Sequence, residues 1–397
     1  MLTRRVLLAT LAAPAIARAA PPLRLGVLTT LAGPAADGAG TGSVLAARMA
    51  IEDHPGAAAE VLVADMGDRP ETGATIAREW LDRQGVLAVL DVPNSATALA
   101  VAALVRDRDR IALFSGPGST ALTRASCSPN HLQWTYDTAA LAAGSARAIL
   151  AEGGDTWFFL TADYVFGRTL QADVSSVVQQ SGGRVLGAAL FPAETSDFSP
   201  LLLRAKVSGA RVVALAAAGA QFETMVKQAA EFGIAQGGQR LASPLCLITN
   251  VHAIGLDDAQ GLLVTEPFYW GLDDGTRAFA ARFAPRNRGI PPTMVHAGVY
   301  SATRHLLRTV AAGADPAQGA ATIAAMKRLP ADDALFKRST LRPDGGVSHP
   351  MHLFQVKSPQ ESAGAWDAYR LLRTIPADEA FQASAGCSQM TPPPASP

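Results

Sequence analysis

Short apolar runs alternate with stretches of helical periodicity along the chain, and this alternation constrains the fold more than any other feature. In the first third of the chain the predicted strands are 23–29, 60–64, 86–92 and 111–115. The predicted helices are 42–53, 71–84 and 96–108. Strands that are apolar on both faces must be covered on both sides, so this pattern predicts a parallel sheet between layers of helices.

The alternation stops at a turn-rich break, 117–130, and then begins again. The second set of predicted strands is 156–160, 184–191, 212–217, 245–249 and 261–264. The second set of predicted helices is 139–151, 165–180, 198–208 and 220–232. Two further helices, 274–284 and 293–312, do not fit another strand–helix unit, and 351–356 is a late strand. The sequence therefore predicts an α/β fold of two Rossmann-like lobes with a hinged interlobe cleft.

The beginning of the chain has the pattern of an export signal. Arg4 and Arg5 precede an apolar stretch, 6–16, and the small-x-small site 17–19 follows it. The paired arginines also fit the twin-arginine route. We expect residues 1–20 to be a signal peptide and the protein to be periplasmic. The other expected boundaries are 21–136 plus 268–346 for the first lobe, 137–267 plus 347–388 for the second lobe, and 389–397 for a loose tail.

Composition narrows the functional classes. The 34 basic residues balance the 34 acidic ones, so the sequence shows no basic surface for nucleic acid or for a membrane. The three cysteines match no zinc spacing. Cys246 lies in an apolar run and is expected to be buried. Cys127 and Cys387 lie among turn residues, where they either pair in an oxidising compartment or remain free.

The loops after the predicted strands carry the candidate ligand-binding groups, because ligands bind at the carboxyl ends of the strands in such sheets. Asn94 or Ser95 can cap the helix that follows, and the free N–H groups of its first turn can hold a carboxylate. Gly116 and its small neighbours allow the backbone to approach a ligand. The aromatic run 268–270 offers Tyr269 or Trp270 for cleft contact.

These loops resemble those of the periplasmic solute-binding proteins of branched-chain amino acid ABC transporters. The resemblance rests on LRLGVLTTLAGPAADGAG, SGPGSTALT with the CSP that follows, DYVFG, SDFSPLLLRAKVSGARVVALA and QAAEFGI. It implies a type I periplasmic binding fold, a small-molecule ligand, a membrane permease as partner, a monomer and no cofactor. The ligand-binding positions that we expect are Asn94, Ser95, Ala96, Thr97, Gly116, Pro117, Ser119, Tyr136, Tyr164, Ala218, Gly219, Asn250, Tyr269 and Trp270.

Two positions depart from amino-acid-binding members of that family. Members that bind amino acids often have an acidic residue near Asn250, which receives the ammonium group, and an aromatic residue near Ala35. In this chain Asn250 is neutral and Ala35 is not aromatic. Both departures argue against an α-amino acid ligand, so an aromatic or short-chain acid without an amine fits as well as, or better than, a solute like a branched-chain amino acid. We expect the first lobe to hold the carboxylate of this solute while Tyr164 closes over it from the second lobe.

Two other functional classes remain open. A sensor of the same fold would feed a membrane receptor instead of a permease. A secreted enzyme would need a catalytic group, and Asp163, His252 and Glu266 are the candidates. The chain has no Gly-x-Ser-x-Gly, Walker or His-Glu-x-x-His motif. His349 and His352 are separated by a proline, which argues against a metal pair on a helix.

Overall fold

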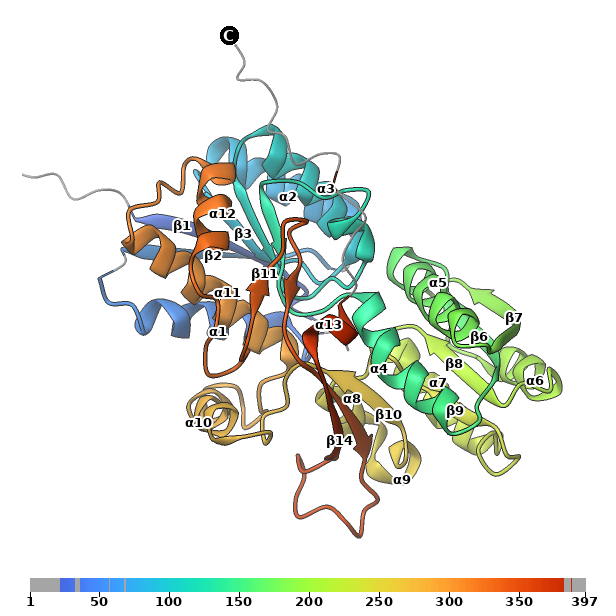
Figure 1. Cartoon of the computed structure of the whole chain (residues 1–397). Helices are drawn as coiled ribbons and strands as arrows, with labels where there is room; N and C mark the ends of the chain where they lie inside the picture. The colour runs from blue at the N-terminus through green and yellow to red at the C-terminus, as the bar shows by residue number, and fades with distance from the viewer. Residues whose placement is uncertain (1–21, 33–35, 57, 68, 382–386, 388–397) are drawn as a thin grey trace, which may run out of the picture.

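The computed structural model describes residues 22–32, 36–56, 58–67, 69–381 and 387. The expected signal peptide, the expected tail and Ala35 lie outside the described residues. The described chain forms two α/β lobes, each built on its own sheet, which confirms the predicted fold class (Figure 1).

The first sheet is entirely parallel and has the strand order β2-β1-β3-β4-β5. Its strands are β1 (Leu23–Thr29), β2 (Ala59–Asp65), β3 (Ala88–Asp91), β4 (Ile111–Phe114) and β5 (His131–Gln133). The helices between them are α1 (Gly40–Glu52), α2 (Pro70–Arg83), α3 (Ser95–Asp107) and the 3₁₀ turn η1 (Thr120–Thr123). Strand β2 is at the sheet edge and only partly buried, so one face of it departs from the expected double-sided burial.

The second sheet has the order β14-β13-β10-β9-β8-β6-β7, in which β13 and β14 are antiparallel to their neighbours. Its strands are β6 (Thr156–Ala162), β7 (Arg184–Phe191), β8 (Val212–Ala216), β9 (Arg240–Ala242), β10 (Leu263–Glu266), β13 (Met351–Val356) and β14 (Tyr369–Ile375). Its helices are α4 (Thr138–Ala151), α5 (Val165–Gln180), α6 (Ser199–Val207), α7 (Gly219–Glu231), α8 (Ile248–Ile254), α9 (Leu256–Ala259) and α13 (Ala377–Ala380).

The chain between β10 and β13 returns to the first lobe. It contains α10 (Asp274–Phe283), η2 (Ala284–Arg286), α11 (Met294–Ala311), α12 (Gly319–Arg328) and the β11–β12 hairpin (Thr340–Leu341, Val347–Ser348). Helix α11 packs against α1, and Arg282 of α10 forms an ion pair at 2.7 Å with Asp53, the residue that follows α1. In Figure 1 the orange helices α11 and α12 accordingly lie beside the blue strands.

The chain thus passes between the two sheets after β5, after β10 and before β13. Chain segments that connect two lobes side by side can act as a hinge, since each segment can absorb a small backbone rotation. We propose that the lobe boundaries lie at these passages, close to 136–137, 267–268 and 346–347.

One predicted strand is wrong. Residues 245–249 do not form a strand, because 243–247 is a loop and α8 begins at Ile248. The strand at this place in the sheet is the short β9, with Leu241 pairing to Val213. A short apolar run has no periodicity that separates a buried strand from a buried loop and helix start. The sequence also gave no indication of β5, β14 or α12.

The cysteines fall into two classes. Cys246 is a fully buried free thiol, as expected, and burial raises its pKa. A disulfide joins Cys127, between β4 and β5, to Cys387 near the end of the chain. Within the described residues, none of the helices combines the length and the apolar character needed to span a bilayer.

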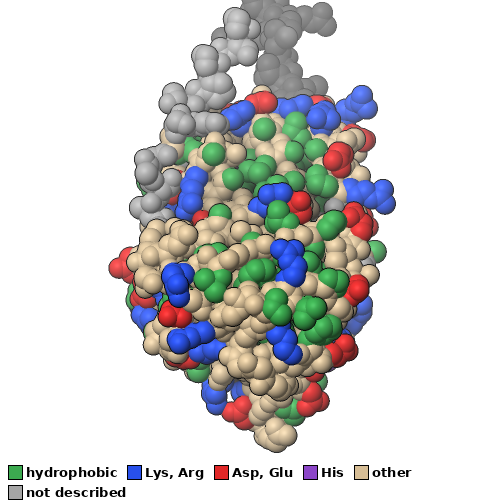
Figure 2. Space-filling model, turned by 90° about the vertical axis from the view of Figure 1, so that its right-hand side faces the viewer, with side chains coloured by type: hydrophobic (Ala, Val, Ile, Leu, Met, Phe, Trp, Pro, Cys, Tyr) green, Lys and Arg blue, Asp and Glu red, His purple; other side chains and the backbone are tan. Residues whose placement is uncertain are grey.

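Lys, Arg, Asp and Glu side chains are intermixed on the face of the second lobe that carries α5, α6 and β7 (Figure 2). Leu186 and Leu190 on β7 and Leu203 on α6 are exposed. This face therefore has neither a uniformly positive nor a uniformly negative electrostatic potential.

Candidate interlobe ligand site

The first-lobe side of the site begins with a strained turn at the end of β3. Asp91 and Val92 have φ values of 72° and 57°, a region that non-glycine residues rarely occupy. Such a residue costs about 1–3 kcal/mol, and residues of this kind cluster at binding sites. The turn directs the chain through Pro93 into the first turn of α3 at the carboxyl edge of the sheet.

A buried carboxyl group supports this turn from below. Asp91 is fully buried and accepts a hydrogen bond from Thr29 Oγ1 at 2.9 Å. Burial raises the pKa of Asp91 to about 6, although the hydroxyl groups of Ser43 and Thr29 partly offset it. A Cβ on Gly116 would lie 2.6 Å from Cα of Pro93 and 2.9 Å from Oδ1 of Asp91. Only glycine therefore allows the β3 and β4 loops to lie this close together.

The residues at the start of α3 have different roles: one caps the helix, and another is a candidate for ligand contact. Asn94 is the N-cap, and its Oδ1 accepts a hydrogen bond from the N–H of Thr97 at 3.1 Å, which confirms the expected cap. The side chain of Thr97 faces α2, where it occupies the space that a Cβ on Gly73 would need. The hydroxyl of Ser95 is buried and has no hydrogen-bond partner among the described residues. Ser95, with the Ala96 backbone beside it, is thus the better candidate for ligand contact at this helix.

The loop from 116 to 119 is held by side chains from the first passage between the lobes. Tyr136 donates its hydroxyl hydrogen to the Gly116 carbonyl at 2.6 Å, and burial raises the pKa of this tyrosine. Gln133 Nε2 donates to the Pro117 carbonyl at 3.0 Å. The Ser119 hydroxyl caps η1 by accepting from the N–H of Ala121. We therefore assign Tyr136 the support of the loop rather than contact with the ligand.

The second-lobe side is formed by the loops after β6 and β8. Tyr164 precedes α5, and its hydroxyl oxygen accepts a hydrogen bond from the N–H of Ala218 at 3.2 Å. Ala218 in turn precedes α7, which begins at Gly219 without a side-chain cap. Uncapped N–H groups at the start of a helix of this length attract anions and other acceptors. The structure thus brings Tyr164, Ala218 and Gly219 together, as expected.

Asn250 has an acidic partner that the sequence did not reveal. Its Nδ2 donates to Glu223 Oε1 at 2.8 Å, and its Oδ1 accepts from the N–H of Leu247 at 2.9 Å. Glu223 is half-buried on α7, and burial raises its pKa. The hydrogen bond from Asn250 and the charge of Lys227 partly offset this rise, whereas the charge of Asp37 adds to it.

The polar groups of Tyr269 and Trp270 are hydrogen-bonded to the second lobe. Both donate to the carbonyl oxygen of Trp366, at 3.0 and 2.9 Å. The buried Tyr269 ring packs against the rings of Phe354 and Tyr369. We infer that Tyr269 shapes the second passage between the lobes, and that Trp270, which is only partly buried, is the one available for contact.

The two sides meet where the first-lobe loop touches α5. A Cβ on Gly118 would lie 2.9 Å from the Phe166 ring, and the hydroxyls of Ser119 and Thr169 are 3.3 Å apart. The residues expected from the sequence therefore include some from each lobe, with Gly116–Ser119 on the first and Tyr164 on the second.

The three candidate catalytic residues have separate structural partners. Asp163 forms an ion pair with Arg168 at 2.5 Å. The ring of His252 stacks on Trp366 with centroids 4.0 Å apart. Glu266 is buried, accepts a hydrogen bond from Tyr369 at 3.0 Å, and has a pKa raised well above its usual range by burial. Among the described residues, no group of three or more His, Cys, Asp or Glu side chains is arranged to hold a metal.

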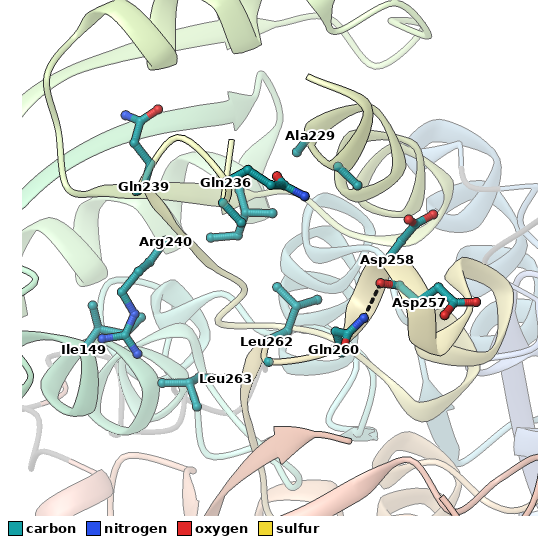
Figure 3. A pocket seen from close by; sticks show the side chains of 15 residues that line it. Ile149, Ala229, Gln236, Gln239, Arg240, Asp257, Asp258, Gln260, Leu262 and Leu263 are labelled. Atoms are coloured by element: carbon teal, nitrogen blue, oxygen red, sulfur yellow. Dashed lines mark hydrogen bonds between the residues drawn. The ribbon is translucent and has the colours of Figure 1, made fainter. Parts of the chain in front are cut away.

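A cavity of about 420 Å³ lies elsewhere, at the amino ends of β9 and β10 (Figure 3). Its lining includes the apolar side chains of Leu262 and Leu263 and the polar side chains of Gln236 and Arg240. The Gln239 amide points away from the cavity and donates to the Ala205 and Ala210 carbonyls. This cavity is at the opposite end of the second sheet from the strand ends that carry Tyr164 and Ala218.

Sequence reasoning missed Glu223 and a second acid, Asp173 of α5. Asp173 occupies the buried stripe of α5 in register with Phe166, Leu170 and Val177. An acid at an otherwise apolar position of a helix stripe was the available signal, because buried carboxylates need partners. Glu223 carried no such signal, since only the fold places it beside Asn250.

A family model described as periplasmic binding protein matches residues 22–365. A periplasmic binding protein from Burkholderia mallei is 37% identical, with 92% of this chain and 97% of that one covered and a TM-score of 0.88. A branched-chain amino acid ABC transporter periplasmic ligand-binding protein from Burkholderia xenovorans LB400 is 36% identical, with 91% and 97% covered and a TM-score of 0.81.

More distant proteins share the fold. A Rhodopseudomonas palustris ABC transporter solute-binding protein in complex with benzoate has a TM-score of 0.81 at 18% identity, with 92% of this chain and 99% of that one covered. The Leu/Ile/Val-binding protein homolog 6 of Brucella abortus (strain 2308) is 25% identical over 200 residues, which are 49% of this chain. The match spans only 50% of that relative's length.

Proposed function

This chain belongs to the periplasmic binding protein family, and from that premise we propose that it is the extracytoplasmic substrate-binding subunit of an ABC importer. It captures a small carboxylate-bearing solute between its lobes and delivers it to a membrane permease. The binding cycle is a shift of population from an open form to a closed form in which both lobes contact the solute. No bond of the solute changes in this cycle.

The opposition of two polar loop edges carries the proposal. On the first lobe, the buried Ser95 hydroxyl without a described partner and the first turn of α3 offer donors to a carboxylate. On the second lobe, Tyr164 and the uncapped start of α7, which follow β6 and β8, are the groups that we assign to the opposite side of the ligand. Closure over a ligand removes the site from water, which strengthens each of these hydrogen bonds.

The proposed ligand class rests on the ligands of similar proteins and on the carboxyl group of Glu223. The Burkholderia xenovorans relative is a branched-chain amino acid transporter component, and more distant neighbours hold benzoate and 4-hydroxybenzoate. Glu223 revises the argument made from Asn250 alone, because this position has a carboxyl group after all: one of its oxygens accepts from Asn250, and we propose that the group also accepts from an ammonium or a phenolic hydroxyl of the ligand. We propose a small amino acid or an aromatic acid as the solute.

A thermal-shift screen tests the proposal directly. The panel contains leucine, isoleucine, valine, benzoate, 4-hydroxybenzoate and short-chain acids with their amides. A ligand at about 100 times its Kd stabilises the native state by about 2.7 kcal/mol, which raises the melting temperature measurably. Amides of a binding acid should give no shift, since the carboxylate is the anchoring group. Recovery of chemically altered ligand would contradict a binding protein.

Tyr164→Ala is the matched variant for this screen. It should abolish or strongly reduce the shift while the free protein unfolds at nearly the wild-type temperature, because Tyr164 lies at the lobe edge. An unchanged shift would exclude Tyr164 from the site. A receptor-coupled sensor is the second candidate function, and deletion of the gene separates the two: uptake of the identified ligand falls for an importer subunit and persists for a sensor.

A further inference from the structure

One face of α5 lies against the loop of the first lobe that follows β4. Phe166 packs against Gly118, and Thr169 lies opposite Ser119 with the hydroxyl oxygens 3.3 Å apart. One helical turn further along α5, Asp173 reaches Thr120. Positions i, i+3 and i+7 of a helix share one face, so these contacts form a single line along α5.

Asp173 is the polar centre of this line. Its Oδ2 accepts hydrogen bonds from Thr138 Oγ1 at 2.5 Å and from Thr120 Oγ1 at 3.1 Å. Its Oδ1 lies 3.4 Å from Nη1 of Arg124. The carboxylate is buried, with 11% of its side chain exposed, so it depends on these partners.

The partners divide between the two lobes. Thr138 begins α4, which packs on α5 in the second lobe. Thr120 and Arg124 belong to the first-lobe loop, whose far end is fixed by the Cys127 disulfide. A carboxylate shared in this way keeps all of its partners at only one angle between the lobes.

We propose that Asp173 is a positioning residue that couples the angle between the lobes to the conformation of the ligand-binding loop 116–119. When the lobes close, Asp173 draws Thr120 and Arg124 toward α5 and sets Ser119 and Pro117 in their binding positions. When the lobes open, the carboxylate keeps Thr138 and releases the loop. The part of this proposal in which loop 116–119 binds the ligand rests on the proposed function. The part in which Asp173 controls the angle between the lobes does not.

Small-angle X-ray scattering of the ligand-free protein tests the control of the lobe angle. Thr120→Val removes the threonine hydrogen bond that Asp173 receives from the first lobe and keeps the shape of the side chain. Thr138→Val removes the bond to the same carboxylate from within the second lobe and is the matched control. We expect a larger radius of gyration for Thr120→Val and for Asp173→Ala than for the wild type, and no change for Thr138→Val.

Equal scattering curves for Thr120→Val, Asp173→Ala and the wild type would overturn the proposal. An equal increase for Thr120→Val and Thr138→Val would also overturn it, because the effect would then be a general loosening around Asp173. If Asp173→Ala does not fold, the two threonine variants decide the question on their own.

Calorimetric titration with leucine and with benzoate tests the coupling to the ligand loop. Loss of one hydrogen bond worth about 1 kcal/mol corresponds to roughly fivefold weaker binding of whichever probe binds the wild type, and this is the change expected for Thr120→Val. An unchanged affinity would overturn the coupling. If neither probe binds the wild type, the proposed ligand class fails, and the scattering result still decides the role of Asp173.

Discussion

Replacement of His296 by glutamine should make the stability of this protein depend less on pH. His296 is fully buried on α11, where its Nε2 lies 2.7 Å from the Ala39 carbonyl oxygen and its Nδ1 lies 3.1 Å from the Thr293 N–H. A carbonyl oxygen only accepts and an N–H only donates. The ring must therefore carry its hydrogen on Nε2 and keep Nδ1 bare, which is the neutral form.

The magnitude follows from the pKa. Burial lowers the pKa of His296 from 6.5 to about 4. As the pH falls below 6.5 the unfolded chain takes up this proton and the folded protein does not, so stability is lost between pH 6.5 and pH 4. Between pH 7 and pH 4.5 the loss from this one residue is about 2–3 kcal/mol.

Glutamine can donate to Ala39 but does not titrate. At pH 7, His296→Gln should be less stable by about 1–3 kcal/mol, because the buried N–H of Thr293 loses its acceptor. At pH 4.5 this deficit should shrink by about 2–3 kcal/mol. The wild type loses that much stability because its histidine is protonated only in the unfolded chain, whereas glutamine does not titrate in either state. Urea unfolding followed by tryptophan fluorescence at both pH values measures the two deficits.

A non-titrating core variant on the same helix provides the control. Val295→Ala should cost the same free energy of unfolding at pH 7 and at pH 4.5. A deficit of His296→Gln that is equally independent of pH would refute the reasoning, because it would mean that the histidine contributes packing alone.

Three further predictions concern the stability of the fold. Replacing Cys127 and Cys387 by serine should lower the free energy of unfolding by about 2–4 kcal/mol, which a reduced wild-type sample should reproduce in its melting temperature. Tyr136→Phe should cost about 1–3 kcal/mol in urea unfolding, because the buried Gly116 carbonyl loses its donor, and an unchanged midpoint would argue against this support. Burial raises the pKa of Asp91 to about 6, so its ionisation destabilises the fold as pH rises from 4 to 7; relative to the wild type, Asp91→Asn should gain about 2–3 kcal/mol over that range.

Much of the local structure was predictable from the sequence, because it depends on neighbours along the chain. Helix α5 begins and ends where the pattern predicted, since its apolar stripe and the turn residues before it are local features. Asn94 caps α3 as expected, because an N-cap needs only the N–H groups of the next turn. The failure at 245–249 has the same origin: that apolar run is buried by distant elements, and its length and composition do not specify a strand.

The sequence by itself determined the alternation of strands and helices, and with it the two-lobed α/β fold and the loops that we propose to carry a ligand. Only the tertiary structure decided which side chains in those loops are free to do so. It commits the Tyr136 hydroxyl to Gly116, turns Thr97 toward α2 and brings Glu223 to Asn250, 27 residues away. The physical reason is that strand and helix formation reflects short-range periodicity, whereas burial and hydrogen-bond partners depend on residues that meet only when the chain returns between its lobes.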